Sequence, residues 1–323
     1  MARRQAYFIS LLFAALVAAS DACSQAWPDR PVKIIVPYAA GGTSDGVGRL
    51  LAARLGDVFG QPFIIENRPG ASGAIAAEAV MRAPPDGYTL FLASLPQITI
   101  MPLVLKTSFD PRADVVPISL ISTNPMVIVA NPQLPAKSIA DFVAYAREHR
   151  GRLTYAAVGT GSFTHLAMAL FLKRAGIEMT PVMYKGGAPA ITDVVAGRVS
   201  AHFALVSNIL PYVQGGLLRP LAVSSAHRLP QMPSVPTMIE AGYPGFVLLN
   251  WTGLVAPAGT PRMILDRIAL EVSRAARDPK IAAQWTGLGV DPVGSGPEGL
   301  KARIDADIPL WKDAVGIAGL RPQ

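Results

Sequence analysis

The sequence predicts an α/β fold of two lobes, each a mostly parallel sheet flanked by helices, with crossing strands as a hinge. Three observations carry this prediction. Short apolar, β-branched runs alternate with helical patterns along most of the chain. The 323 residues are 51% hydrophobic, which can supply a core, and a chain of this length suggests two lobes. Two apolar segments, 115–129 and 251–255, lie where the chain would pass between the lobes.

The first lobe begins with an apolar run over 32–36, which reads as a buried strand. Apolar residues at helical spacing follow over 47–58, and Gly60 supplies a stop signal. A strand over 63–66, an Ala-rich helix ending at Met81 and a strand over 88–93 continue the pattern. Strands and helices alternate in this way in parallel sheets that are covered on both faces.

The second lobe repeats the unit. We expect helices over 139–149, 163–175 and 189–196, and strands over 153–157, 182–184 and 199–206. Thr260 followed by Pro261 predicts a capped helix start. The predicted boundaries give 27–125 with 246–323 as lobe 1, and 126–245 as lobe 2.

Residues 1–26 have the features of a secretory signal peptide, because a basic start precedes an apolar run over 8–19 that is too short to span a bilayer. Cleavage after Ala26 is one interpretation. Cys23 as a lipidated N-terminus is the other, although Asp21 places a charge where such signals are apolar. Both predict an exported, periplasmic protein. The first removes the only cysteine, and with it any disulfide or thiolate metal site.

Charge and motifs argue against several classes of protein. The net charge is +7, but the basic residues are scattered, so nucleic acid is not an expected partner. The four histidines stand alone without metal-ligand spacing, and we expect no metal site. Neither a dinucleotide fingerprint nor a phosphate loop is complete, and we expect no cofactor.

Three loops share one design, in which a predicted strand runs into glycines and a helix starts at once. They are 41–45, 159–162 and 185–189. The first N–H groups of a helix have no internal partner and carry partial positive charge, so such starts bind anions. In an open sheet these loops lie at the carboxyl ends of strands, where ligands bind. The pattern predicts an anion site; simple turn and cap roles are the alternative.

A serine hydrolase is a competing interpretation. Gly42 to Gly46 match the pattern G-x-S-x-G, with Ser44 as the nucleophile, between a predicted strand and a helix. An α/β-hydrolase needs several strands before this turn and a histidine late in the chain. Here the turn follows the first predicted strand and the last histidine is His227. We therefore expect a binding protein and no enzyme.

Several motifs are similar to those of a known family. They are 36–45 (VPYAAGGTSD), 66–71 (ENRPGA), 85–90 (PDGYTL), 159–162 (GTGS) with His165 and Leu166, 184–186 (YKG), 189–190 (PA) with Asp193, 219–223 (RPLAV) and 233–237 (PSVPT). Together they make the chain resemble the Bug family, the TctC-like substrate-binding proteins of tripartite tricarboxylate transporters. The resemblance runs through nearly all of the chain after the leader.

The resemblance implies a hinged periplasmic binding protein of type II, the Venus flytrap fold, which closes on its ligand. It implies a small organic carboxylate as ligand (a dicarboxylate, an amino acid or an aromatic acid), membrane permease subunits as partners, and a monomer. A sensory role at a receptor is the alternative. The implied ligand-binding residues are Tyr38, Gly42, Thr43, Ser44 and Asp45 on one wall, Gly161, Ser162 and His165 on the other, and Ser94 and Gly186 nearby.

One departure concerns the far end of the ligand. Many members of the family have an acidic residue followed by Asn after the strand predicted at 199–206. Here the segment 204–208 reads Ala-Leu-Val-Ser-Asn. The far end of the predicted pocket is therefore less polar, and the ligand group that it receives is open.

Overall fold

The computed structural model describes residues 27–107 and 109–321. The predicted leader and Cys23 lie outside these residues. Within the described ranges, no helix is both long and apolar enough to cross a membrane.

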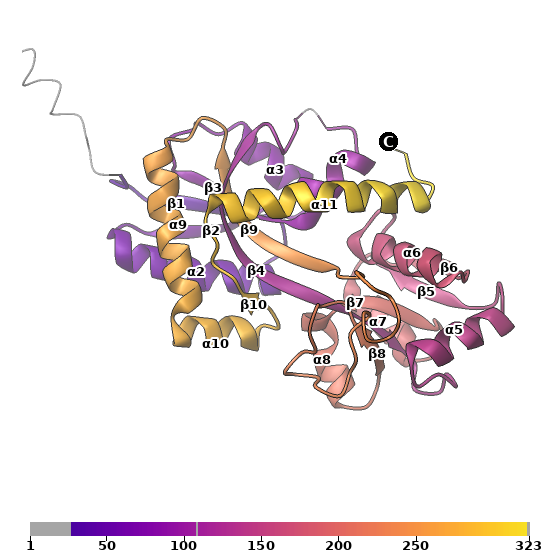
Figure 1. Cartoon of the computed structure of the whole chain (residues 1–323). Helices are drawn as coiled ribbons and strands as arrows, with labels where there is room; N and C mark the ends of the chain where they lie inside the picture. The colour runs from indigo at the N-terminus through magenta and orange to yellow at the C-terminus, as the bar shows by residue number, and fades with distance from the viewer. Residues whose placement is uncertain (1–26, 108, 322–323) are drawn as a thin grey trace, which may run out of the picture.

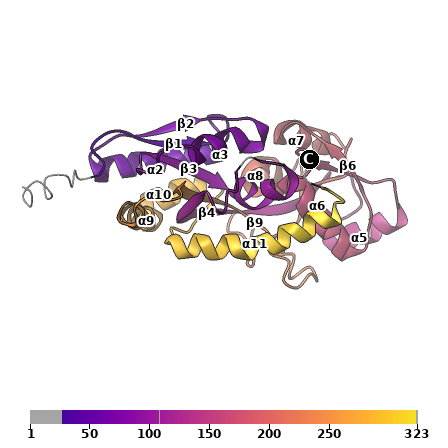
Figure 2. The same cartoon turned by 90° about the horizontal axis from the view of Figure 1, so that it is seen from above.

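Two α/β lobes lie side by side and are joined by two long strands and by the last helix (Figures 1 and 2). The first lobe holds β1 (Val32–Val36), α2 (Thr43–Phe59), β2 (Phe63–Asn67), the short turn η2 (Ala71–Gly73), α3 (Ala74–Met81), β3 (Thr89–Ser94), the π-helical turn η3 (Pro96–Ile100), α4 (Met101–Val104), α9 (Arg262–Arg277), α10 (Pro279–Gly287) and β10 (Asp291–Pro292). The second lobe holds α5 (Ile139–Glu148), β5 (Thr154–Ala157), α6 (Phe163–Ala175), β6 (Thr180–Met183), α7 (Gly187–Val195), β7 (Ala201–Leu205), α8 (Val206–Gln214) and β8 (Arg219–Val223). The connecting elements are β4 (Val115–Ala130), β9 (Leu249–Pro257) and α11 (Pro297–Ile317).

The sheet confirms the predicted fold class. β1 pairs in parallel with β2 and β3 in the first lobe, and β5 pairs in parallel with β6 and β7 in the second. The crossing strands are antiparallel to their neighbours, giving the order β2-β1-β3-β9-β4-β7-β5-β6. Parallel strands end at one edge, so the loops after β1, β2 and β3 gather together, and so do those after β5, β6 and β7.

The apolar segment 115–129, expected to pass between the lobes, lies in one continuous strand. β4 pairs with β9 as far as Pro125 and with β7 from Met126 onward. β4 therefore belongs to the sheets of both lobes, and β9 pairs with it in the antiparallel direction. The exact division into lobes at 125/126 and 245/246 stays a prediction.

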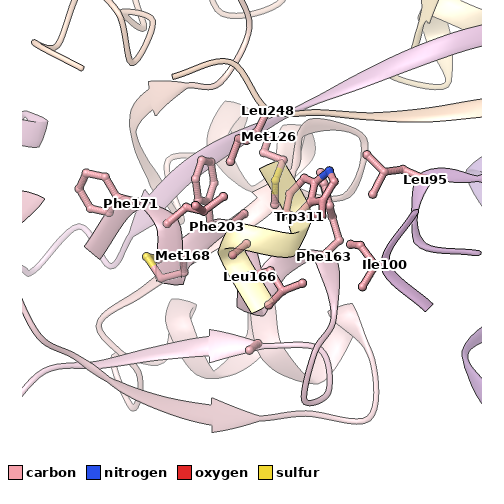
Figure 3. Close-up of a cluster of buried hydrophobic side chains, with 14 of the residues drawn as sticks. Leu95, Ile100, Met126, Phe163, Leu166, Met168, Phe171, Phe203, Leu248 and Trp311 are labelled. Carbon is pink, nitrogen blue, oxygen red and sulfur yellow. The ribbon is translucent and has the colours of Figure 1, made fainter. Parts of the chain in front are cut away.

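Hydrophobic packing continues across the lobe junction. One buried cluster includes Leu95 and Ile100 of the first lobe and Phe163 of the second, together with Trp311 of α11 (Figure 3). The rings of Phe163 and Trp311 have their centres 5.0 Å apart. Two further clusters fill the α2–α9 side of the first lobe and the α7–α8 side of the second.

Two sequence expectations were wrong in detail, and three helices were missed. The strand predicted over 199–206 ends at Leu205, because Val206 starts helix α8. Thr260 does not cap α9; its hydroxyl donates to the Pro257 carbonyl at 2.8 Å, and Pro261 occupies the cap position. The sequence interpretation also did not anticipate α8, α10 and α11, although α11 is the longest described helix.

Candidate functional site

The loop after β1 leads into a helix start without a side-chain cap. Gly42 is the N-cap of α2 and has extended backbone angles, φ −82° and ψ 172°. No side chain accepts from the first N–H groups of α2, so those of Thr43 and Ser44 remain available to a ligand. Gly41 turns the chain with φ 87°, which favours glycine. This start has the donors and the dipole needed to hold an anion.

Asp45 organises this loop. Its buried carboxylate accepts from the Gly41 N–H and Arg49 Nε at 2.9 Å each, and from Asn67 Nδ2 at 3.0 Å. Asn67 Nδ2 also donates to the Tyr38 carbonyl at 3.0 Å. The bond from Arg49 is the main reason why the Asp45 pKa falls to about 2. The structure therefore places Asp45 in contacts that fix the loop, with both carboxylate oxygens occupied.

Gln97 was missed by the sequence analysis. Its Oε1 accepts from the Ser94 N–H at 3.0 Å, and its Nε2 donates to the Tyr38 hydroxyl and the Ser72 carbonyl at 3.1 Å each. The Tyr38 residue is 36% exposed, but its hydroxyl is shielded from water, and this desolvation raises its pKa, so the hydroxyl stays neutral. Gln97 thus joins the loops after β1, β2 and β3. Its signal was an amide side chain inside the mostly apolar segment 95–101.

In the second lobe, the loop after β5 is closed by its own side chains. Ser162 caps α6, and its Oγ accepts from the His165 N–H at 3.3 Å. The Gly161 N–H donates to His165 Nδ1 at 3.1 Å, which requires the neutral ring with its proton on Nε2. Burial lowers the His165 pKa, in agreement with that state. His165 can therefore donate one hydrogen bond from Nε2.

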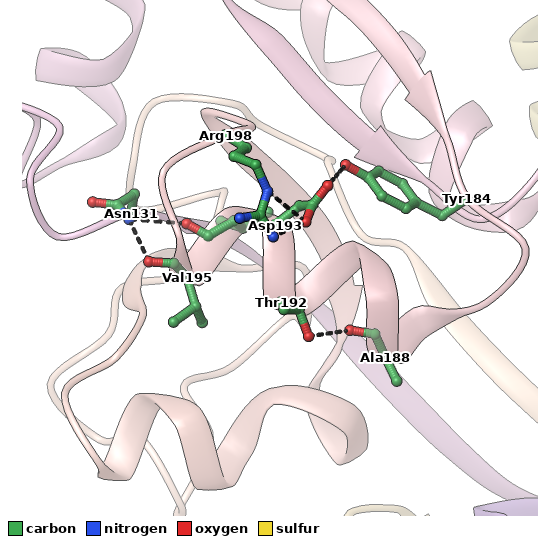
Figure 4. Close-up of polar contacts among 8 residues, drawn as sticks. Asn131, Tyr184, Ala188, Thr192, Asp193, Val195 and Arg198 are labelled. Carbon is green, nitrogen blue, oxygen red and sulfur yellow. Dashed lines mark hydrogen bonds and ion pairs between the residues drawn. The ribbon is translucent and has the colours of Figure 1, made fainter.

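The loop after β6 is held from the far side by Asp193 (Figure 4). Asp193 accepts from the Tyr184 hydroxyl at 2.7 Å and from Arg198 Nε at 2.9 Å. Burial raises the Tyr184 pKa to about 12. Helix α7 then starts with Gly186 as its N-cap and, as in α2, without a side-chain cap. A Cβ at Gly186 would meet no atom within 4 Å, so this helix start is open.

The structure brings the predicted residues to three helix starts and one strand end. Tyr38 and Gly42 to Asp45 gather at the start of α2, and Ser94 ends β3 next to Gln97. Gly161, Ser162 and His165 form the start of α6, and Gly186 forms that of α7. In the described ranges, no group of three or more His, Cys, Asp or Glu residues is arranged to hold a metal ion.

Comparisons with known proteins agree with one another. A family model described as "Tripartite tricarboxylate transporter family receptor" matches residues 47–314. The protein BugT of Bordetella pertussis is 32% identical over 315 residues, which cover 97% of both chains. A solved structure of an R. palustris protein with adipate is 36% identical, has a TM-score of 0.82 and covers 92% of this chain and 100% of its own. MatC from Rhodopseudomonas palustris with bound malate is 34% identical, with a TM-score of 0.77, covering 90% and 100%.

Proposed function

The chain belongs to the tripartite tricarboxylate transporter receptor family, and we propose that it captures a small organic carboxylate between its lobes and delivers it to the permease subunits of such a transporter. Members of this family are periplasmic solute-binding proteins, so the chain is a binding protein and not an enzyme. The hydrolase interpretation of Ser44 is thereby set aside.

The observation that carries the proposal is the pair of helix starts without side-chain caps, α2 in the first lobe and α7 in the second. A carboxylate can accept from the free N–H groups and is favoured there by the helix dipole. Relatives solved with adipate and with malate support the same ligand class. The hydroxyls of Thr43 and Ser44, and the Nε2–H of His165, are further donors that the proposal assigns to the ligand.

Lobe closure is the proposed mechanism. When the lobes close, fixed N–H and O–H donors replace water around the carboxylate, in a medium of lower dielectric constant that strengthens each contact. Asp45 and Asp193 do not bind the ligand in this scheme; they hold the two loops in a binding-ready shape. In this proposal the leader directs export to the periplasm. There the protein acts as a monomer.

Gly42→Val tests the proposed carboxylate site. The backbone of Gly42 is extended and a Cβ would meet only the Ala39 carbonyl, at 3.8 Å, so the fold accepts a side chain there. The added methyl groups would cover the N–H groups of α2, and we expect calorimetry with adipate and malate to show affinity reduced by about tenfold or more. Gly56→Ala, in the same helix and with ordinary contacts, is the control and should bind normally. Equal affinities in the two variants would contradict the site.

A sensory role differs from transport only in the partner that recognises the liganded form. Uptake of radiolabelled ligand by cells with and without the chain separates the two. Loss of uptake in the deletion strain supports delivery to a permease.

A further inference from the structure

The crossing strands carry a row of polar side chains on one face. In antiparallel strands, directly opposite residues project to the same side of the sheet. The register places Ser94 opposite Thr252, Thr252 opposite Ser122, and Asn250 opposite Asn124. These five residues from β3, β9 and β4 are named the polar hinge face.

The polar hinge face lies on the α2 side of the sheet. Trp251, between Asn250 and Thr252 in β9, points to the opposite side, where its Nε1 donates to Asp307 of α11 at 2.7 Å. Leu254, which shares the side of Thr252, packs in the core cluster with Val47 and Leu51 of α2. The face is therefore on the same side of the sheet as the helix whose start forms the first wall.

Four oxygen atoms of this face are buried without a partner. Ser94 Oγ, Ser122 Oγ, Asn124 Oδ1 and Asn250 Oδ1 have no hydrogen-bond partner among the described residues. Folded proteins pair nearly all buried polar atoms, because an unpaired one loses its bond to water without replacement. A concentration of four such atoms on one patch of sheet points to a group that is supplied from outside the chain.

The amide of Asn124 is oriented by the second lobe. Its Nδ2 donates to Ser207 Oγ in α8 at 2.9 Å, and Ser207 Oγ donates to Asn208 Oδ1 at 3.4 Å. This sequence of bonds leaves Asn124 Oδ1 as an acceptor. Gly289 of the first lobe lies against Ser207, so close that a Cβ at this glycine would be 2.7 Å from the Ser207 Cα. The lobes therefore meet directly at this face.

Two carboxylates of neighbouring segments, Asp45 and Asp291, do not face these oxygens. Asp45 is occupied by Arg49, Asn67 and the Gly41 N–H. Asp291 is opposite Thr123, whose side chain is on the other side of the sheet. The segment 204–208, which leads into Ser207, contributes no carboxylate.

We propose that the polar hinge face is the subsite for the far end of the bound carboxylate, and that it selects a neutral hydrogen-bond donor, a hydroxyl or an amide N–H. This inference rests on the proposed function. A second carboxylate would face the Asn124 and Asn250 carbonyl oxygens, which cannot donate to it, an ammonium would lack a counter-ion, and a methyl group would leave the oxygens unpaired. A hydroxyl can donate to an Asn carbonyl and accept from a Ser hydroxyl at once.

The same contacts link ligand selection to closure. The four oxygens are buried in this arrangement, and Asn124 is bonded to Ser207 of the second lobe, so in this proposal the lobes part to admit the ligand. If the lobes close on a ligand without a hydrogen-bond donor, the oxygens of the polar hinge face stay buried and unpaired. If they close around a hydroxyl group of the ligand, these oxygens gain a hydrogen-bond partner. A hydroxyl-bearing ligand therefore shifts the population toward the closed form more than a ligand without one.

The test compares length-matched acids by calorimetry: hexanoate, 6-hydroxyhexanoate, 6-aminohexanoate and adipate, and the shorter set of butyrate, 4-hydroxybutyrate, 4-aminobutyrate and succinate. We expect the hydroxy acid to bind about tenfold or more tightly than its matched partners in at least one set. Asn250→Ala and Ser122→Ala should remove this preference while carboxylate binding continues.

Thr123→Ala is the control, because Thr123 lies in the same strand and projects to the opposite side. It should keep the preference for the hydroxy acid. Equal affinities within both sets, or a preference that survives in Asn250→Ala and Ser122→Ala, would overturn the subsite and leave the carboxylate function intact. Failure of every acid in both sets to bind would overturn the carboxylate function together with the subsite.

Discussion

Two acidic residues act in the same way at the two walls of the proposed site. Asp45 and Asp193 each follow a glycine loop in the sequence, and each accepts hydrogen bonds that fix that loop. Their positions in the sequence could not show whether these two residues contact a ligand or support the loops, because their hydrogen-bond partners are brought to them by the fold. Asn67 reaches Asp45 from 22 residues away. The role of Gln97 could not be assigned for the same reason, because its partners Tyr38 and Ser72 come from other loops.

Ser162→Ala separates ligand binding from helix capping. Ser162 caps α6, so its replacement should cost about 1 kcal/mol of unfolding free energy, and Ser138→Ala at the start of α5 should cost a similar amount. Only Ser162→Ala should also weaken carboxylate binding, because only Ser162 lies at the proposed site. Urea denaturation and calorimetry measure the two effects. Equal affinity in both variants would remove Ser162 from the binding residues.

His202 should make stability depend on pH. It is fully enclosed, its Nδ1 donates to the Ala156 carbonyl at 2.8 Å, and burial lowers its pKa from 6.5 to about 4. The unfolded chain therefore binds more protons between these two values, and stability falls as the pH drops from about 6.5 toward 4. Between pH 7 and pH 5 we expect a loss of about 2 kcal/mol from this residue.

His202→Gln tests this source of the pH dependence. Glutamine does not titrate, so the variant should lose clearly less stability than the original chain between pH 7 and pH 5 in urea denaturation. A residual loss is expected, since burial also lowers the His165 pKa. An unchanged pH dependence in His202→Gln would show that other groups are responsible.

At the scale of elements, local signals predicted the strand–loop–helix units well. α2 and α6 begin where glycine and serine patterns place them, and α2 ends at Gly60 with φ 70°. Elements that depend on tertiary packing were missed. α8 starts directly at the end of β7, and α11 shows little amphipathic pattern because it contacts both lobes. Thr260 failed as a cap because its hydroxyl bonds backward to Pro257.

Helix α11 should depend on one buried carboxylate. Asp307 accepts from Trp251 Nε1 at 2.7 Å and from Arg303 Nε at 2.9 Å, and burial raises its pKa. Asp307→Ala would leave the buried indole N–H without a partner and the mostly buried Arg303 guanidinium without a counter-ion, with only the Leu249 carbonyl as acceptor, and should cost about 3 kcal/mol. Asp305→Ala, two residues earlier, breaks only an exposed pair with Lys301 and should change stability by less than about 0.5 kcal/mol. Similar losses in the two variants, measured by thermal unfolding, would contradict this role.

At the scale of the whole molecule, the alternation of elements was enough to predict the fold class, and the motifs predicted the family. What could not be predicted was how the lobes meet. Ser94, Ser122 and Asn250 become one face only through strand register, which depends on the pairing of segments more than 100 residues apart. The glycine loops predicted an anion site, whereas the polar hinge face proposed for the far end of the ligand left no local pattern.

The central claim is that the two lobes hold a small organic carboxylate. It is tested most directly by mass spectrometry of the ligand released from protein that has been purified without denaturation. We predict recovery of an organic acid in stoichiometric amount from the original chain, and a strongly reduced amount from Gly42→Val. Recovery of a molecule without a carboxyl group, in equal amounts from both proteins, would contradict the account.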